Sequence, residues 1–249
     1  MPLSDVRWFG IDFAFTLMNP LTMHHSTVLP EMYKRLGRGE EGKERLERWY
    51  KLREAMGSPG DAPHQKVRLM KEYNRRRLHA EVFDNDPAAI KMYAEMEAIE
   101  RRPPEGTKEA LEYLRGKGKG LSVVSEVSGV EGTLSISESL RANKLLGLFD
   151  ELITPAGRFT TTGALIDGVT FKGTSKKDGT IYERLANYLD SKEVGTGARA
   201  MVGDDPKSDI ESAKERGFVT IQYSGVINRG RSEKADYFLS NWSELRLLL

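Results

Sequence analysis

Short apolar runs alternate along this sequence with segments whose apolar residues recur at helical spacing. Between the runs, stripes such as Ala110, Leu111 and Leu114 put apolar side chains on one face of a helix. Strands separated by helices predict an α/β protein, in which a parallel sheet carries helices on both faces. The runs that predict strands are Val6–Ile11, Leu121–Val124, Glu151–Ile153, Ala200–Val202, Phe218–Ile221 and, as a sixth, Tyr237–Leu239.

The segment from residue 18 to residue 103 breaks this alternation, because its pattern predicts helices and no strand. Asp86 followed by Pro87 is typical of a helix N-terminus with proline at the first helical position. An all-helical insertion directly after the first strand predicts a cap domain over residues 18–103, with an α/β core formed by residues 1–17 and 104–249. The stripes that predict the cap helices are Val28–Leu36, Leu46–Met56, Val67–Tyr73 and Ala89–Ile99.

A second irregularity lies between Gly157 and Gly173. Two short β-prone runs, residues 158–162 and 169–171, flank the turn-forming pair Asp167-Gly168. We predict a small β-hairpin here, with this pair at its turn.

Composition removes several classes of function. The chain has 38 Lys and Arg against 37 Asp and Glu, so its net charge of +1 gives no field for gathering polyanions, and we expect neither nucleic acid nor a membrane surface as a partner. The absence of cysteine excludes disulfides, thiolate metal sites and cysteine nucleophiles. No apolar run approaches the ~18 residues of a membrane span and the N-terminus has no signal-peptide pattern, so we expect a cytoplasmic protein.

Polar side chains of complementary chemistry follow several predicted strands. Asp12, Ser125 and the pair Asp204-Asp205 come at or just beyond strand ends, and Lys176 precedes a predicted helix. Because open α/β sheets place their ligand crevices at the carboxyl ends of strands, we expect these groups to lie close together. Carboxylates can hold Mg²⁺ through their oxygens, while an ammonium and a hydroxyl can contact a phosphate. The sequence therefore predicts a phosphate-handling site with a metal ion.

Four segments around these residues resemble the motifs of the haloacid dehalogenase (HAD) superfamily. Residues 12–17, Asp-Phe-Ala-Phe-Thr-Leu, are similar to the first motif, usually written DxDGT(L/V), and Gly203–Asp209 resembles the fourth, GDxxx(x)D. Ser125 and Lys176 stand where the second and third motifs have a Ser or Thr and a Lys. The order agrees across nearly the whole chain, and the helical insertion lies where the family has its C1 cap. The resemblance implies a hydrolase with a Rossmann-like α/β core and a helical cap.

The resemblance also implies a role for each residue. Asp12 would be the nucleophile, attacking phosphorus to form an aspartyl-phosphate. Ser125 would donate a hydrogen bond to the transferring phosphoryl group. Lys176, with Lys177 as its rival, would hold the nucleophile and the phosphate in register. The implied substrate is a small phosphorylated or phosphonate metabolite. Mg²⁺ would be the cofactor, and its ligands would be Asp12, the backbone carbonyl of Ala14, Asp204 and Asp209.

Three residues depart from the family pattern. Ala14 stands where typical phosphatases have an Asp that acts as general acid and base, a contribution of about 10²–10⁴-fold, so phosphomonoester turnover should be slow. Phe15 replaces a glycine and would narrow the site, and Glu126 puts a negative charge near any phosphate. Ala14 is similar to the DxAGT motif of phosphonoacetaldehyde hydrolase, but the cap lysine of that enzyme has no counterpart, because Gly60 stands in its place.

Structural explanations compete for some of these residues. Asp205 before Pro206 is typical of a helix N-cap, and a capping box of Ser175 and Asp178 would leave Lys176 on the surface. Three functional hypotheses remain open. The first is a Mg²⁺-dependent hydrolase of a phosphorylated or phosphonate metabolite. The second is a phosphate-metabolite binding protein without turnover, and the third is a metal-independent dehalogenase, which would also use an Asp nucleophile.

Overall fold

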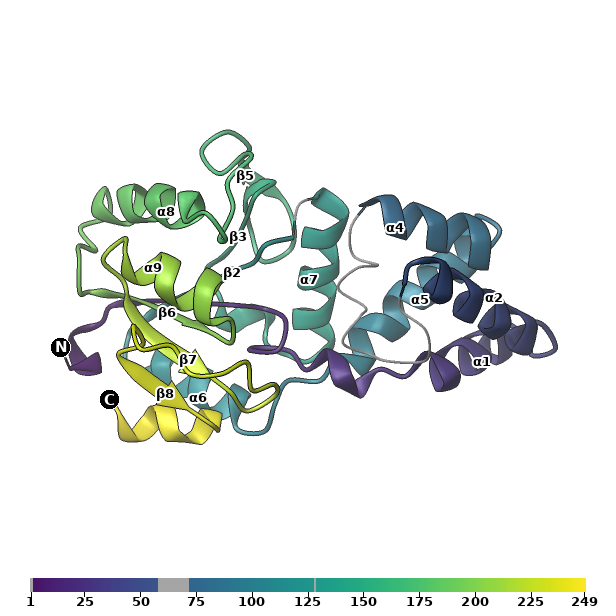
Figure 1. Ribbon diagram of the computed structural model, residues 1–249, viewed down its shortest axis with the longest axis horizontal. Helices are drawn as coiled ribbons and strands as arrows, with labels where there is room; N and C mark the ends of the chain where they lie inside the picture. Colours follow the sequence, from purple (N-terminus) through teal and green to yellow (C-terminus); the bar gives the residue numbers. More distant parts are fainter. Residues whose placement is uncertain (1, 58–71, 128) are drawn as a thin grey trace.

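An eight-stranded mixed sheet forms the centre of the computed structural model, which describes residues 2–57, 72–127 and 129–249 (Figure 1). The strand order is β5-β4-β3-β2-β1-β6-β7-β8; the pairs from β3 to β8 are parallel, and β3-β4 and β4-β5 are antiparallel. The predicted α/β fold is confirmed. The six predicted strands are β1 (Trp8–Ile11), β2 (Gly120–Val124), β3 (Glu151–Thr154), β6 (Arg199–Gly203), β7 (Val219–Tyr223) and β8 (Tyr237–Leu239).

Helices cover both faces of the sheet. Successive side chains of a strand point to opposite faces, and here both faces carry apolar side chains that must be covered. On β1, Phe9 and Ile11 join a hydrophobic core with α6 (Thr107–Gly116) and α7 (Val130–Ala142). Trp8 joins a second core on the other face, which α8 (Thr180–Asp190) and α9 (Ser212–Lys214) complete. Shorter helical segments are η1 (Leu3–Asp5), η2 (Pro20–Thr22), η5 (Leu146–Leu148), η6 (Pro206–Glu211) and η7 (Trp242–Leu247).

The helices between β1 and β2 pack around a hydrophobic core of their own, whose buried members, among them Trp49 and Tyr93, come from residues 23–96. The helix predicted at Asp86 begins as expected, because its carboxylate accepts a hydrogen bond from the Ala88 N–H at 2.9 Å. Figure 1 shows these helices at one end of the molecule, where α5 packs against α7. They are α1 (His25–Arg35), α2 (Glu41–Ala55), α4 (Glu72–Arg77), η4 (Leu78–Val82) and α5 (Pro87–Glu100).

Most of the helix predicted over Val67–Tyr73 lies outside the described residues. The domain boundaries at residues 17/18 and 103/104 stay predictions. Within the described ranges, no helix has the length and apolar character needed to cross a bilayer.

The predicted hairpin is present, but its second strand and its turn lie elsewhere. Strand β4 (Gly157–Phe159) pairs with β5 (Leu165–Asp167), and Gly163 in the turn has a φ of 89°, which favours glycine. The prediction that the hairpin turns at Asp167-Gly168 and continues as a strand over residues 169–171 is wrong. The Asp167 carboxylate accepts hydrogen bonds from the backbone N–H groups of Val169 (2.8 Å) and Thr170 (3.1 Å), and this local turn ends the strand.

Candidate active site

The candidate site lies at the carboxyl end of β1. This strand lies between β2 and β6. After β1 the chain adds β2, β3, β4 and β5 on one side of it, and then β6, β7 and β8 on the other side. Such a switch in direction opens a crevice where α/β sheets bind ligands. Asp12 directly follows the strand, and its N–H donates to the Val202 carbonyl of β6 at 2.9 Å. Asp204 follows β6, so the two carboxylates leave neighbouring strands at the same edge.

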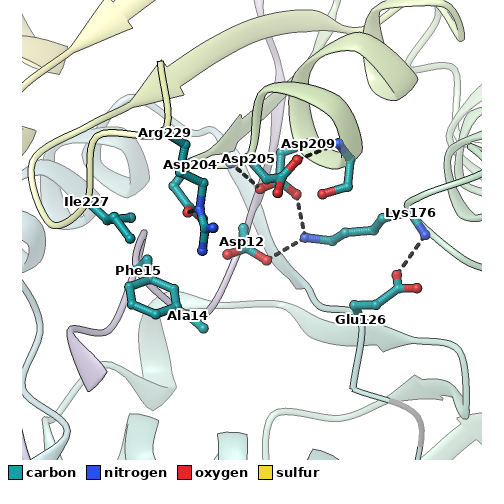
Figure 2. Close-up of a pocket in the computed structure, with 11 residues that line it drawn as sticks. Asp12, Ala14, Phe15, Glu126, Lys176, Asp204, Asp205, Asp209, Ile227 and Arg229 are labelled. Carbon is teal, nitrogen blue, oxygen red and sulfur yellow. Dashed lines mark hydrogen bonds and ion pairs between the residues drawn. The ribbon is translucent and has the colours of Figure 1, made fainter. Parts of the chain in front are cut away.

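Three buried carboxylates meet there (Figure 2). One ligand oxygen from each of Asp12, Asp204 and Asp209 lies within 4.8 Å of the others. Asp209 belongs to η6, and it can approach because residue 203 is glycine: a Cβ there would come within 2.3 Å of the Asp209 Cβ. Oxygen ligands at this spacing fit a Mg²⁺ ion, which takes one or two carboxylates together with water and phosphate oxygens.

Lys176 bridges two of these carboxylates. Its Nζ lies 2.5 Å from Asp12 Oδ1 and 2.8 Å from Asp209 Oδ1, and its side chain is only 2% exposed. Lys177 is exposed, so the structure brings Lys176 and not its rival into the cluster. The capping box that would have left Lys176 on the surface is absent, because α8 begins at Thr180 with Gly179 as its N-cap.

Glu126 binds the loop that carries the lysine. One carboxylate oxygen accepts from the Ser175 hydroxyl and the other from the Lys176 backbone N–H, both at 2.7 Å. The sequence predicted only a negative charge near a phosphate. The structure shows that this charge anchors the loop before α8, and so helps to place the ammonium of Lys176.

Ser125 does not line the cavity. It is buried, and its N–H extends the pairing of β2 by donating to the Ile153 carbonyl at 3.0 Å. Its predicted contact with a phosphoryl group stays a prediction. Asp205 is the N-cap of η6, as its place before Pro206 suggested, because its carboxylate accepts hydrogen bonds from the N–H groups of Lys207 and Ser208.

The cavity above the carboxylates has a volume of about 360 Å³. Ala14 and Phe15, which closely follow Asp12 in the chain, lie below it in Figure 2, and Ile227 and Arg229 come from the loop after β7. One wall is therefore acidic and the other combines apolar groups with a guanidinium. The lining residues are Asp12, Ala14, Phe15, Glu126, Lys176, Asp204, Asp205, Ser208, Asp209, Ile227 and Arg229.

Phe15 has a left-handed backbone conformation, which glycine adopts more readily than other residues. Its φ is +65°, a left-handed conformation that costs an ordinary L-residue about 1–2 kcal/mol. The turn is held by the Phe15 N–H, which donates to the Met18 carbonyl at 2.8 Å. The ring is buried and lies 5.2 Å from the guanidinium carbon of Arg229. The turn after Asp12 thus carries an aromatic side chain that lines the cavity.

Three residues at the site were missed by sequence reasoning. The hydroxyl of Thr16 donates to Asp204 Oδ1 at 3.4 Å, and the Tyr182 hydroxyl donates to Asp209 Oδ1 at 3.5 Å. Arg229 pairs with Asp204 through Nε at 2.6 Å. Thr16 could have been found, because it belongs to the first motif. The other two lie in segments whose sequence carries no signal for the site.

Burial and the charges of neighbouring groups shift the pKa values of Asp12 and Lys176. Burial raises the pKa of the Asp12 carboxyl well above its ordinary value; the Lys176 ammonium opposes this shift, and Asp209 and Asp204 reinforce it. Burial lowers the pKa of Lys176, but Asp12 and Asp209 outweigh burial and raise it well above its ordinary value. Lys176 therefore stays an ammonium at neutral pH, and a bound cation would favour the ionised form of Asp12.

The stability of the metal-free protein should depend on the charge of Asp204. Burial raises the pKa of Asp204 to about 6, Asp209 adds to the shift and Arg229 opposes it. A raised pKa contributes stability that is complete below the unfolded-state pKa of about 4 and is lost as pH rises through the folded-state value. In EDTA, we expect Asp204→Asn to raise the free energy of unfolding by about 1–3 kcal/mol at pH 7.5 and to change it little at pH 4.5.

Urea unfolding at the two pH values checks this prediction, and Asp205→Asn is its control. Burial raises the pKa of Asp205, but hydrogen bonds from the backbone of Ser208 and Lys207 outweigh it and lower the pKa. Asn also serves as an N-cap, so the control should give no gain at pH 7.5. A gain for Asp204→Asn that is equal at both pH values would contradict the prediction.

Comparison with solved structures identifies the fold. The chain is similar to a HAD phosphatase from Thermococcus onnurineus, with 22% identity over 98% of this chain and 97% of that one and a TM-score of 0.56. It is similar to a 2-haloacid dehalogenase from Pseudomonas syringae pv. Tomato, with 16% identity, the same coverage and a TM-score of 0.56. A magnesium-bound HAD-hydrolase from Bacillus subtilis has 12% identity over 98% of both chains and a TM-score of 0.56. No family model matches the sequence. A search of curated proteins finds no significant match.

Proposed function

Since the chain has the fold of the HAD-superfamily hydrolases, we propose that it is a Mg²⁺-dependent hydrolase of a small phosphorylated or phosphonate metabolite. The observation that carries the proposal is the contact of Lys176 with Asp12 inside a triad of carboxylates. A carboxylate nucleophile, a fixed ammonium and a cation site at one point are the groups that phosphoryl transfer requires.

The chain's own residues would position the nucleophile. Lys176 holds Oδ1 of Asp12, and Figure 2 shows the second carboxylate oxygen pointing away from Lys176. That oxygen would form a bond to phosphorus as the bond from phosphorus to the leaving group breaks, and water would then attack the aspartyl-phosphate and release Asp12. Mg²⁺ bound by Asp12, Asp204, Asp209 and the carbonyl of Ala14 would neutralise the phosphoryl oxygens.

Ala14 restricts the substrates. Its methyl group lines the cavity where a general acid would stand, and it can give no proton to a leaving group. Substrates whose leaving group is stable as an anion, or which carry their own proton donor, suit this site best.

The proposal is tested with an aryl phosphate whose phenol is acidic. We expect turnover that EDTA abolishes and that Mg²⁺ restores. Asp12→Asn should lower this turnover at least about tenfold; because the wild-type rate is itself slow without a general acid, a larger decrease would be hard to measure. Asp190→Asn is the control, because this carboxylate is exposed at the end of α8 and does not line the cavity, so the variant should leave turnover unchanged. Release of halide from a 2-haloacid in EDTA, without phosphatase activity, would instead favour the dehalogenase.

A second candidate function, binding of a phosphorylated metabolite without turnover, is favoured by two observations. Ala14 leaves the site without a proton donor at this position, and Arg229 pairs with Asp204, a residue that would also bind the metal ion. Thermal stabilisation by Mg²⁺ together with orthovanadate, without turnover of the aryl phosphate, would support this candidate.

A further inference from the structure

Arg229 forms the one ion pair to Asp204 within the described part of the chain. Its Nε lies 2.6 Å from Asp204 Oδ2, and the carboxylate is 5% exposed while the arginine side chain is 37% exposed. The guanidinium also lies over the Phe15 ring, so a carboxylate and an aromatic face both hold it. Figure 2 shows it beside Asp204, on the side of Asp12 opposite Lys176.

This ion pair changes the charge that a metal ion would meet. The triad of Asp12, Asp204 and Asp209 brings three negative charges to one point. Lys176 and Arg229 bring two positive charges into direct contact with it, which leaves one net negative charge on these five side chains; Glu126 and Asp205 also line the cavity. A divalent cation is attracted by the net charge around it, and in a buried cluster each nearby unit charge has a large effect on that attraction.

We propose that Arg229 is a positioning residue that occupies Asp204 in place of a divalent cation and thereby sets the cation affinity of the site. A cation that takes Oδ2 of Asp204 must displace Nε, and the guanidinium would then keep only its contact with Phe15. The inference rests on the proposed function in one respect, that the triad binds Mg²⁺. It goes beyond that function because it assigns to this arginine control over how tightly the site binds a metal ion.

An alternative role would give the opposite result. If Arg229 merely held Asp204 in the geometry that metal binding needs, removing the arginine would weaken Mg²⁺ binding. If it competes with the cation, removing it strengthens binding. The direction of the change in Mg²⁺ affinity therefore decides between competition and structural support, without any measurement of turnover.

The test is isothermal titration of MgCl₂ into the metal-free full-length chain at pH 7.5 and constant ionic strength. For Arg229→Met, which keeps an apolar stem against Phe15, we expect the dissociation constant to fall at least about tenfold. Arg229→Lys retains the charge and should stay within about threefold of wild type. Arg231→Met is the matched control: it removes a positive charge from the same loop, where the guanidinium stacks on Phe238, and should stay within about twofold.

Equal or weaker Mg²⁺ binding by Arg229→Met than by wild type would overturn the inference and leave the proposed function standing. An equal gain for Arg231→Met would overturn it as well, since overall charge would then explain the effect. Binding by Arg229→Met with none detectable in wild type supports it. If neither binds, both the inference and Mg²⁺ dependence fail. Thermal unfolding in EDTA establishes that each variant is folded, and Arg229→Gln replaces the Met variant if that one is not.

Discussion

Replacing Ala14 by Asp is expected to raise the rate of phosphomonoester hydrolysis by about 10²–10⁴-fold. Ala14 lines the cavity next to Asp12, so a carboxyl group introduced there would reach the leaving group and could give it a proton. The gain in kcat/KM should be larger for an alkyl phosphate than for an aryl phosphate with an acidic phenol, because only the alkoxide needs the proton. Steady-state kinetics with both esters in Mg²⁺ measure the difference.

Ala88→Asp is the matched control for this gain. Ala88 is exposed in the first turn of α5, where a carboxylate suits the helix dipole, and it does not line the cavity. It should leave both rates unchanged. If Ala14→Asp gives no gain, the double variant with Phe15→Gly tests whether the ring blocks the site, because glycine accepts the φ of +65° without strain. Failure of both variants would contradict the assignment of Asp12 as a phosphoryl acceptor.

Replacing Lys176 by Met is expected to destabilise the protein by about 3–5 kcal/mol and to reduce turnover to background. The substitution leaves the buried carboxylates of Asp12 and Asp209 without the ammonium that lies 2.5 and 2.8 Å from them. Because burial raises the pKa of Asp12, protonation relieves part of this cost, and the loss should shrink as pH falls. Urea unfolding in EDTA at pH 7.5 and at pH 5 measures it.

Lys177→Met is the matched control for this loss. The side chain of Lys177 is exposed in the same loop, so its removal should change the free energy of unfolding by less than about 0.5 kcal/mol and leave turnover intact. Equal effects of the two substitutions, or a loss below about 1 kcal/mol for Lys176→Met, would show that the buried ion pairs do not hold the site together.

Local sequence patterns were sufficient for much of the fold. The six strands and the helical insertion follow from short-range apolar periodicity. Positions that are buried in the sheet, or in the separate core of residues 23–96, must be apolar, and they recur at the period of the strand or helix to which they belong. The hairpin was placed with the wrong second strand. Asp167-Gly168 is a good turn pair, but whether it ends a strand or turns a hairpin depends on its partners, here the N–H groups of Val169 and Thr170.

By itself, the sequence determined that Asp12 and Asp204 would lie at the carboxyl edge of the sheet, because each follows a predicted parallel strand. Lys176 follows no strand, and its place beside them was expected from the resemblance to the HAD motifs. Only the tertiary structure decided how those charges are balanced. Glu126 anchors the loop before α8, and Arg229 reaches Asp204 across 25 residues of chain. Such contacts depend on how separate loops pack above the sheet, and no periodicity within either loop encodes the approach of the other.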